Sequence, residues 1–532
     1  MATVAASPRA TQPLFADRVG MIDTENAFKV GPYIKEVEDS GQQVVRCNIG
    51  EPDFPLPRHI AEEVKRQIDN DLTHYNDPQG ILPLREAIAN TMGASRNLHI
   101  TPDRVVVFPG AKPPIGFTQQ TYCNAGDEVI YPSPGFPIYE SFVRYIGASA
   151  VPLHLEESSG FNFRGNDLRK LITDRTKLIY INFPSNPTGG VASREQLSEI
   201  ADVILAETGG NTRVYSDEVY ERILFDGEKH TSIASLPGME ARTIIVSGVS
   251  KSYSWTGGRI GWAVFPTAEE AAVFKNLNIN YFSCVPAYNQ MGAKVALESP
   301  ESEIAITTMV DAFSKRRDFV VAALNAIDGI RCQNPKGAFY VFPNIGGVCE
   351  NLGAVEAHAS LPASIRDYTT PSTLFQLFLL FKHNVATLDR KSFGRIGSEG
   401  KHYLRLSIAT SLEQLKLGMD RIAAHEHALT ERLLAGLAER PWVRVVGPAE
   451  AVDRVGAVAF DVEGVHAHDV GQVLDDQGVA VRVGHHCAWP LHRRMGVTAS
   501  TRASLAAYTT PAEVDAMLDA LDRVPDVFGV AV

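Results

Sequence analysis

The chain has 532 residues, of which 45% are hydrophobic and 21% are charged, and its net charge is −12. This length exceeds one ordinary hydrophobic core, so we expect about three domains of a globular protein. The negative charge argues against a nucleic-acid-binding protein, which needs a surplus of Lys and Arg to neutralise phosphates.

The sequence shows no membrane or secretion signal. The most apolar run, residues 374–381, is far shorter than the roughly 20 residues that a membrane span needs. The first twenty residues contain Arg9, Asp17 and Arg18 and no apolar core of a signal peptide. The six cysteines are scattered and form no Cys-x-x-Cys pair, which favours reduced thiols. We therefore expect a cytoplasmic protein with no membrane or nucleic-acid partner.

Residues 46–295 alternate short β-branched runs with helical patterns, bounded by Gly, Pro, Asn or Asp. This alternation predicts an α/β domain with a mostly parallel sheet covered by helices on both faces. Ligand sites of such sheets lie at the carboxyl ends of the strands, where polar motifs occur in this chain. The predicted strands are 104–108, 128–131, 177–182, 212–216 and 243–247.

Residues 296–423 are predicted to form a second, smaller α+β domain. It begins with a long helix, continues with a strand at 337–343, and ends with a strand and a helix at 403–422. The Gly-, Ser- and Ala-rich segment 345–364 is predicted to be an inserted loop. Residues 1–45 are expected to form an N-terminal arm and part of this smaller domain.

The composition changes after Lys416, which is the last lysine, and seven of the fifteen histidines lie in the remaining part. We therefore predict a separate domain at 424–532. Its pattern indicates a helix, a strand at 455–461, a second helix, a strand at 479–483 and a final helix.

Lys251 follows the last predicted strand of the large sheet, in the sequence Ser-Lys-Ser-Tyr-Ser-Trp-Thr-Gly-Gly-Arg. A lysine whose surroundings lower its pKa can form a Schiff base with an aldehyde. Arg259, eight positions later, offers a planar guanidinium that suits a phosphate. By themselves, the two residues could equally belong to a surface loop.

Two further motifs follow neighbouring strands, at 182–190 and 215–220. A cofactor that accepts electrons through a pyridine ring needs a carboxylate beside the ring nitrogen, and Asp217 is placed to provide it. Asn186 and Tyr220 are suited to hydrogen-bonding a ring hydroxyl. The proline after Asn186 fits a cis peptide bond, since such bonds occur at tight functional turns. Either motif alone could be an ordinary loop.

Gly110, Ala111 and Lys112 follow another predicted strand and precede a predicted helix. Small residues at that place let backbone N–H groups approach a phosphate, although Gly before a helix is common. Phe136 could stack on a pyridine ring; the alternative is an aromatic side chain packed within its loop.

Taken in order, these motifs resemble the class I/II aminotransferase family, which are pyridoxal 5′-phosphate enzymes of fold type I. The resemblance covers about residues 20–423. It implies that Lys251 holds the cofactor as a Schiff base and that Asp217 and Tyr220 take part in catalysis. The matching positions are Gly50 to Pro55, Tyr75, Gly110 to Lys112, Asn186 to Gly189, Asp217 to Tyr220, Ser250-Lys251, Arg259 and Tyr403 to Ser407.

The resemblance also implies how the subunits and the substrate are arranged. Tyr75 would reach the phosphate of a neighbouring subunit's cofactor, so we expect a homodimer with active sites at its interface. Gly50 and Arg405 would bind the amino-acid substrate, and Arg405 would grip its α-carboxylate with two parallel hydrogen bonds. Lys251 would remove the α-proton, a keto acid would leave, and a second keto acid would reverse the path.

Three positions depart from the family pattern. Gly258 stands where the family usually has Trp, the sequence Asp-Arg-Lys at 389–391 stands where it has Pro-Gly, and Pro113-Pro114 is unusual at the head of its helix. These positions border the cofactor or the substrate in the family, which predicts an enlarged or recharged pocket.

A changed pocket keeps other reactions open. The alternatives to transamination are elimination, γ-replacement and carbon–carbon bond formation of the annulation type, on an activated amino acid such as S-adenosylmethionine in specialised metabolism. A non-catalytic, cofactor-binding regulator is a further alternative. The complete set of cofactor residues argues against a regulator, because a protein that does not catalyse has no need of all of them.

The last hundred residues resemble a different protein, the small C-terminal domain of cysteine desulfurases of the selenocysteine-lyase-like type. The resemblance implies that Cys487 would carry sulfur as a persulfide and that Arg502 would hold a carboxylate. The matching positions are His425-Glu426, Gly447-Pro448, Gly464 to Val470, Arg482 to Ala488 and Thr501 to Ser504.

This C-terminal part has no lysine and lacks the cofactor-binding half of a desulfurase. Three roles therefore stay open: a structural domain with an inert cysteine, a domain that docks beside the cofactor, and sulfur transfer through Cys487. A zinc site formed by His485, His486, Cys487 and His492 is conceivable. The desulfurase resemblance explains the His-His-Cys sequence better, so we expect no metal.

Overall fold

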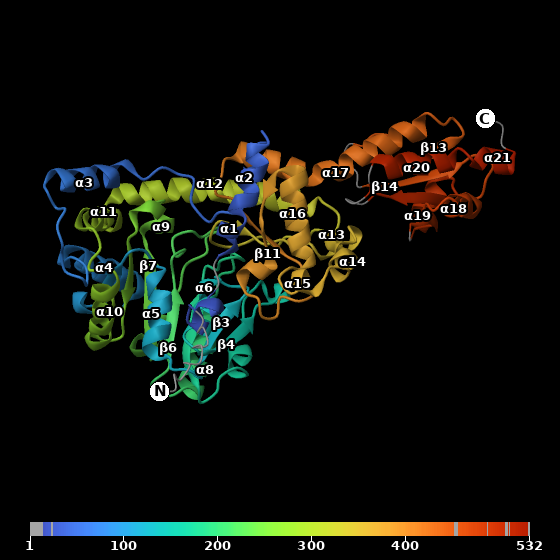
Figure 1. Ribbon diagram of the computed structural model, residues 1–532. Helices are drawn as coiled ribbons and strands as arrows, with labels where there is room; N and C mark the ends of the chain where they lie inside the picture. The colour runs from blue at the N-terminus through green and yellow to red at the C-terminus, as the bar shows by residue number, and fades with distance from the viewer. Residues whose placement is uncertain are drawn as a thin grey trace, which may run out of the picture.

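The computed structural model describes residues 14–22, 25–451, 456–486, 488–505, 509 and 511–529, without the side chains of 424–428 and 511. Its largest sheet has seven strands in the order β2-β8-β7-β6-β5-β3-β4. Every neighbouring pair is parallel except those of β8, which runs antiparallel to β2 and β7. Helices lie on both faces of the sheet (Figure 1). The predicted mostly parallel, helix-covered sheet is confirmed.

Except on the edge strand β4, nearly all side chains of these strands are buried, as expected for β-branched and aromatic runs between two helical layers. The strands are β2 (Val105–Phe108), β3 (Glu128–Ser133), β4 (Ser149–His154), β5 (Thr176–Asn182), β6 (Arg213–Asp217), β7 (Thr243–Gly248) and β8 (Gly261–Val264). The helices are α3 (Arg58–Asp69), α4 (Leu82–Arg96), α5 (Pro113–Tyr122), α6 (Ile138–Tyr145), α7 (Gly165–Arg169), α8 (Arg194–Glu207), α9 (Val249–Ser252), α10 (Ala268–Tyr281) and α11 (Ala287–Glu298).

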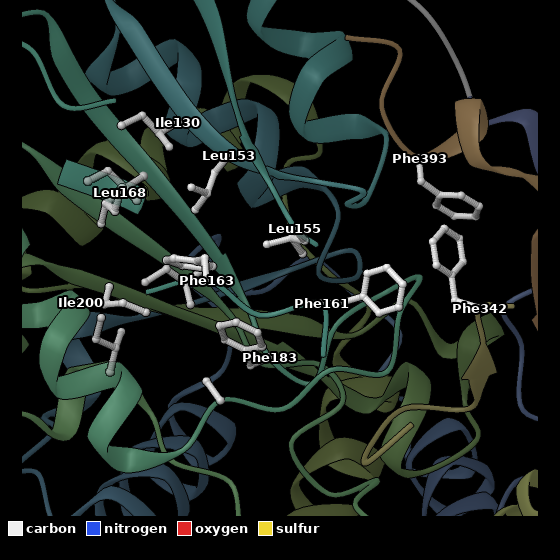
Figure 2. Close-up of a cluster of buried hydrophobic side chains, with 14 of the residues drawn as sticks. Ile130, Leu153, Leu155, Phe161, Phe163, Leu168, Phe183, Ile200, Phe342 and Phe393 are labelled. Carbon is white, nitrogen blue, oxygen red and sulfur yellow. The ribbon is translucent and has the colours of Figure 1, made fainter. Parts of the chain in front are cut away.

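One hydrophobic cluster joins the large sheet to the smaller domain (Figure 2). At one end Ile130 of β3 and Ile200 of α8 pack together with other aliphatic side chains. At the other end Phe342 meets Phe161 edge to face, with ring centroids 5.4 Å apart, and Phe393 at 6.3 Å. Edge-to-face pairs fix relative orientation as well as burying area, so the two domains meet in a defined arrangement.

The smaller domain is built from a short antiparallel sheet, in the order β11-β12-β9, and from a two-stranded parallel sheet of β1 and β10. Within the N-terminal segment (residues 14–46), strand β1 (Val45–Arg46) pairs with β10, and α2 (Gly31–Asp39) contacts α16, so this part of the segment lies against the smaller domain. The helix η1 (Asp17–Met21) instead contacts α6 of the large domain. The remaining elements are α1 (Asn26–Lys29), α12 (Pro300–Asn325), β9 (Tyr340–Val341), α16 (Pro371–His383), β10 (Val385–Ala386), β11 (Leu388–Asp389) and β12 (Leu404–Ser407).

The predicted loop at 345–364 is wrong, because this segment forms helices α13 (Gly346–Asn351), α14 (Ala354–Ala359) and the first half of α15 (Ala363–Arg366). Alanine and glutamate favour helix, and the glycines lie at helix starts, where they cost little. Val348 and Cys349 are buried in the core of the smaller domain, so tertiary packing stabilises these short helices.

The C-terminal part begins within one long helix, α17 (Leu412–Ala438), where the sequence predicted two separate helices. It leads to a four-stranded antiparallel sheet in the order β13-β14-β16-β15, far from the large sheet (Figure 1). The sequence predicted only β14 and β15. The elements are β13 (Val443–Val445), β14 (Ala457–Val462), α18 (Ala467–Asp475), β15 (Arg482–Gly484), α19 (Trp489–Met495), β16 (Ser500–Ser504), α20 (Pro511–Leu521) and α21 (Val524–Phe528).

This sheet has a hydrophobic core of its own. Its buried members lie between Leu429 and Val524, and include Leu433 of α17, Phe460 of β14 and Val470 of α18. None of these residues is shared with the clusters of the other two domains. A separate core of this kind can unfold as a separate cooperative unit.

Within the described part of the chain, no helix is both long and apolar enough to cross a membrane. The five described cysteines are free thiols, and four of them are buried. Burial raises the pKa of the Cys47 thiol to about 12, which keeps it protonated and unreactive.

We predict that Leu433→Ala destabilises only the C-terminal sheet. Deleting a fully buried leucine side chain costs about 2–5 kcal/mol in the free energy of unfolding, and Leu433 packs only within the C-terminal core. Differential scanning calorimetry should show one transition shifted to lower temperature. The matched control Leu168→Ala, in the cluster of Figure 2, should lower another transition instead. Equal shifts of all transitions by both variants would contradict separate cores.

Candidate active site

A cavity of about 430 Å³ lies at the carboxyl ends of β5, β6 and β7. Its lining comes from the N-terminal segment, the large sheet and the smaller domain, so three parts of the chain meet there. Ten of the predicted site residues line it: Gly50, Ala111, Lys112, Phe136, Asn186, Asp217, Tyr220, Lys251, Arg259 and Arg405.

The other predicted site residues lie elsewhere. Gly110 lies directly behind the lining, against Arg259. Tyr75 is 89% exposed and does not line the cavity of its own chain. Arg502 lies on β16, in the C-terminal sheet, where its Nε donates to Ser504 Oγ at 3.2 Å. Cys487 lies outside the described residues.

Asp217 ends β6 with its carboxylate buried at the base of the cavity. The hydroxyl of Tyr139 donates to Oδ2 at 2.6 Å, and the Val219 N–H donates to Oδ1 at 3.4 Å. Among the described residues no cationic side chain forms an ion pair with Asp217. Burial therefore dominates and raises the pKa of Asp217 to about 6. This carboxylate fits a protonated ring nitrogen, which would supply the missing positive charge.

Lys251 lies on α9, directly after β7. Its Nζ donates a hydrogen bond to the Gly50 carbonyl at 2.5 Å. Burial, followed by the positive charge of Arg405, lowers the pKa of Lys251 to about 8. A substantial fraction of the amine is therefore neutral near physiological pH, and a neutral amine is both a nucleophile and a base.

Arg405 projects from β12 and is only 4% exposed. It donates to the Asn48 carbonyl at 2.6 Å and to Asn186 Oδ1 at 3.1 Å, while its Nε has no hydrogen-bond partner. The guanidinium lies 4.4 Å from the Tyr340 ring centroid. Burial lowers the pKa of Arg405, and no carboxylate of the described residues pairs with it. A buried cation with a free donor fits the carboxylate of a ligand.

Two tyrosines meet at the wall of the cavity. The hydroxyls of Tyr220 and Tyr340 are 2.8 Å apart, and burial raises the pKa of both. Both hydroxyls therefore stay protonated and can donate hydrogen bonds. Tyr340 and Tyr139 were not predicted from the sequence, because each contacts a group that is far away in the chain. The strand-like pattern at 337–343 and the Pro-rich motif around Phe136 were the only signals for them.

Arg259 also lines the cavity, and it donates to the Thr256 carbonyl at 2.9 Å and to the Pro109 carbonyl at 3.1 Å. Gly110 adopts φ +95°, and a Cβ there would come within 2.4 Å of the Arg259 Nη2 atom. Only glycine therefore lets the guanidinium approach the turn this closely. Helix α5 begins with two prolines, which lack N–H groups, so N–H donors for a phosphate must come mainly from the preceding turn.

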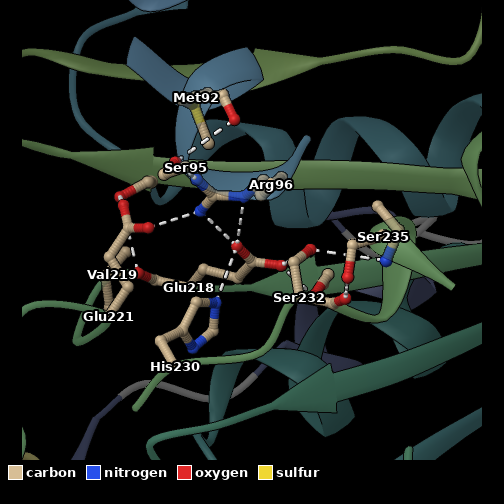
Figure 3. A network of polar contacts seen from close by, with 12 residues as sticks. Met92, Ser95, Arg96, Glu218, Val219, Glu221, His230, Ser232 and Ser235 are labelled. Carbon is tan, nitrogen blue, oxygen red and sulfur yellow. Dashed lines mark hydrogen bonds and ion pairs between the residues drawn. The ribbon is translucent and has the colours of Figure 1, made fainter. Parts of the chain in front are cut away.

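A buried ion-pair network surrounds Glu218, the residue that follows Asp217 in the chain (Figure 3). Glu218 accepts from Arg96 Nε at 3.0 Å and from Ser232 Oγ at 2.5 Å, and lies 3.0 Å from His230 Nε2. Burial alone would raise the pKa of Glu218, but Arg96 and His230 lower it well below its usual value. Glu218, Glu221 and His230 have metal-ligand spacing. Arg96 already pairs with both carboxylates, so we interpret the group as a structural anchor.

The three departures from the family pattern do not line this cavity, which corrects the expectation that they border it. A Cβ at Gly258 would lie 2.3 Å from the indole of Trp255, so Trp255 already fills that space. Asp389 and Lys391 line a second cavity of about 810 Å³. The two cavities share Asn26, Pro137 and Ser392, so the second adjoins the first.

Comparisons with known proteins agree with this geometry. The family model described as aminotransferase class I and II matches residues 42–422, and the one described as aminotransferase class-V matches residues 405–517. The aspartate aminotransferase of Pyrococcus abyssi is 34% identical over 79% of this chain and 99% of its own length. Aromatic-amino-acid aminotransferase 2 of Thermococcus litoralis is 33% identical over 79% of this chain and 99% of its own length.

Solved structures of such relatives share the fold. The structure of the Thermus thermophilus aspartate aminotransferase with maleate superposes with a TM-score of 0.68 at 28% identity. The match covers 78% of this chain and all of that one. The unmatched share of this chain is consistent with its additional C-terminal sheet.

We predict that Lys251 in the cofactor-free protein reacts with an acylating reagent as an amine of pKa about 8. The rate of Lys251 modification, followed by mass spectrometry, should rise through pH 8 as the ammonium loses its proton. Arg405→Leu removes a neighbouring positive charge and should move the midpoint to higher pH. Arg421→Leu, whose arginine lies on α17 outside the cavity and bonds the Gln43 carbonyl, should leave the midpoint unchanged. Equal midpoints in all three proteins would contradict the assigned cause.

Proposed function

The chain belongs to the aminotransferase class I and II family, pyridoxal-phosphate-dependent enzymes of fold type I, and we propose that it transfers the amino group of an α-amino acid to a 2-oxo acid in the cavity around Lys251. One observation carries this proposal. Asp217, Lys251 and Arg405 line one cavity, and none of them has an ion-pair partner among the described residues. Charged groups without counter-charges are costly to bury, which indicates that ligands complete them.

When bound, pyridoxal 5′-phosphate supplies a protonated pyridine ring that stabilises negative charge at the α-carbon of the substrate. We propose a distinct role in holding it for each group of lining residues. Asp217 would face the ring nitrogen, Asn186 and Tyr220 the ring hydroxyl, Phe136 the ring face, Arg259 and the turn Gly110-Ala111-Lys112 the phosphate, and Lys251 would hold the cofactor covalently.

The remaining chemistry belongs to the protein. Arg405 would bind the α-carboxylate and so fix the orientation of the α-carbon, since a planar guanidinium and a carboxylate match in two hydrogen bonds. The Lys251 amine would remove the α-proton as general base, for which a pKa of about 8 is well suited. The Gly50 carbonyl, 2.5 Å from Nζ, would orient that amine. Tyr220 would stay protonated and act as a hydrogen-bond donor.

The comparisons favour transamination over the alternatives. The relatives that match this chain over nearly their whole length are named aminotransferases. Their names give no support to elimination, γ-replacement or bond formation on S-adenosylmethionine. The completeness of the cofactor set likewise disfavours a non-catalytic regulator. One relative is named for aspartate and another for aromatic amino acids, so family membership leaves the substrate side chain open.

We also propose a homodimer in which Tyr75 reaches the phosphate site of the partner subunit. Tyr75 is exposed and does not line the cavity of its own chain, which supports this arrangement. A cytoplasmic location is the accompanying proposal, which the free thiols support.

We propose that the C-terminal part is a desulfurase-like small domain with a structural role. Its match to the class-V aminotransferase model supports the likeness. Among the described residues, none beyond Arg405 lines the cavity, which disfavours docking beside the cofactor within one chain. His486 and His492 each lie about 3 Å from Ser500 Oγ, at 3.1 and 2.9 Å, so protein groups already bond them. We propose domain boundaries after residues 45, 295 and 423, and the last of these boundaries lies within α17.

We predict that Arg405→Ala lowers kcat/KM for amino-acid substrates by about 10- to 100-fold. A charge-assisted hydrogen bond contributes roughly 1.5–3 kcal/mol, and the substrate α-carboxylate would lose this contact. The assay measures 2-oxo acid released from the amino acid in the presence of an amino acceptor. Arg421→Ala, outside the cavity, is the control and should keep wild-type kcat/KM. A wild-type protein that releases no 2-oxo acid would refute transamination itself.

We predict that Cys487→Ser and Arg502→Ala leave kcat/KM for transamination unchanged. Arg502 lies in the C-terminal sheet, outside the cavity. The wild type and both variants, incubated with cysteine, should release no more sulfide than buffer alone. Cysteine-dependent sulfide release by the wild type that is lost in Cys487→Ser would instead establish sulfur transfer.

A further inference from the structure

The second cavity, of about 810 Å³, is not used by the transamination of a short amino acid. Its walls come from the N-terminal segment, α6, α16 and the turn after β11. Asn26, Pro137 and Ser392 line both cavities, so they lie where the two meet. Glu25, next to Asn26, is paired with Lys112 in the first cavity. A ligand held in the first cavity can therefore extend into the second, whose volume is that of a ligand site.

The lining of the second cavity carries more positive than negative charge. Its charged side chains, among the described residues, are Lys29, Glu140, Arg144, Asp389, Lys391 and Arg395. Lys29 and Arg395 have partners of their own. The charge that is available to a ligand is therefore decided by the two carboxylates, by Arg144 and by Lys391.

Both carboxylates are already hydrogen-bonded within the protein. Glu140 is 5% exposed, and its Oε2 accepts from the Tyr131 hydroxyl and the Arg395 N–H, both at 3.0 Å. Asp389 is 3% exposed, and its Oδ1 accepts from the Ser392 N–H at 3.0 Å. Within the described part of the chain, neither forms an ion pair. The two carboxylates hold the backbone around the cavity, and the cations of the lining are left without them.

Arg144 and Lys391 are the cations without a protein counter-charge. Arg144 is exposed on α6, and its guanidinium has no ion pair or hydrogen bond with a described residue. Lys391 Nζ donates to the Asp367 carbonyl at 2.7 Å and to the Thr369 carbonyl at 3.4 Å. Carbonyl groups orient an ammonium without neutralising it, and its third N–H stays available. Both cations can thus bind an anion.

The turn that carries Lys391 is fixed from behind. Arg390 is 1% exposed, and it donates to Ser133 Oγ at 2.9 Å and to the Gly394 carbonyl at 3.0 Å. These bonds join the turn to the end of β3, in the part of the chain that departs from the family pattern. A turn that is held in place before a ligand arrives lowers the entropic cost of binding.

We propose that the second cavity binds an anionic group at the far end of a long substrate side chain, with Arg144 and Lys391 as its partners. This inference rests on the proposed function, because Arg405 would hold the α-carboxylate of the same molecule in the first cavity. The substrate is then an α-amino acid whose side chain is longer than that of aspartate or glutamate and ends in a phosphate or a carboxylate. A guanidinium and an ammonium suit both groups.

Amino acids of equal length test the site on the holoenzyme. The anionic substrates are 2-amino-7-phosphonoheptanoate and 2-aminosuberate, and the uncharged one is 2-aminooctanoate. The ratio of kcat/KM for 2-oxo acid release, anionic over uncharged, isolates the terminal charge and should exceed one in the wild type. Arg144→Gln and Lys391→Gln should each lower this ratio by about three- to tenfold, because each removes one contact with the anion. The larger of the two wild-type ratios identifies the terminal group as phosphate-like or as a carboxylate.

The control is Lys382→Gln, which removes an exposed cation of α16 that does not line the cavity. It should leave the ratios unchanged. Arg144→Gln is the decisive variant, because its side chain has no contact whose loss could disturb the fold. Unchanged ratios in Arg144→Gln, or an equal fall in Lys382→Gln, would overturn the site.

Binding of 7-phosphonoheptanoate provides a readout that needs no turnover, since this compound has no amino group. Isothermal titration calorimetry of the holoenzyme should show that Arg144→Gln binds it about three- to tenfold more weakly than the wild type. Octanoate should bind both proteins equally. Equal affinities for the phosphonate would overturn the inference. A wild type that releases no 2-oxo acid from any amino acid would refute the proposed transamination, and the binding comparison would still decide the role of the second cavity.

Discussion

The structure depends on holding charged groups in one cavity without giving them protein counter-charges. Asp217, Lys251 and Arg405 are all removed from water, and burial shifts the pKa of each toward its neutral form. Such groups destabilise the fold, so the surrounding elements must hold them in place. Parallel strands achieve this, because the carboxyl ends of β5, β6 and β7 bring their polar residues to one edge of the sheet.

Two adjacent carboxylates, Asp217 and Glu218, have pKa values shifted in opposite directions. Glu218 is paired with Arg96, and its pKa is lowered well below the usual value, whereas the pKa of Asp217 is raised to about 6. Glu218 anchors the chain directly after β6 through its contacts with Arg96 and Ser232 (Figure 3). Its neighbour can then remain without a protein cation, because the backbone that carries it is already fixed. The ion pair of Glu218 thus supports the neighbouring carboxylate of Asp217, which has hydrogen bonds but no counter-charge.

Much of the fold was predictable from the sequence, and the exceptions share a physical cause. The five predicted strands of the large sheet are present, because buried strands are continuous apolar runs with clear ends. The helices at 346–366 were missed, because packing of side chains such as Val348 against the rest of the domain stabilises them more than local propensity does. The continuity of α17 was missed for a related reason, since the composition changes in the middle of a helix that the backbone does not interrupt.

The candidate site shows the same division between local and long-range information. Lys251 and Asp217 stand in short motifs directly after strands, so the sequence alone indicates them and the cofactor chemistry. Tyr139, Tyr340 and Glu25 act through partners far away in the chain, and no local pattern reveals such contacts. The large sheet therefore sets the type of reaction, which belongs to the family. The N-terminal segment reaches the same cavity through a contact of this long-range kind, the ion pair between Glu25 and Lys112.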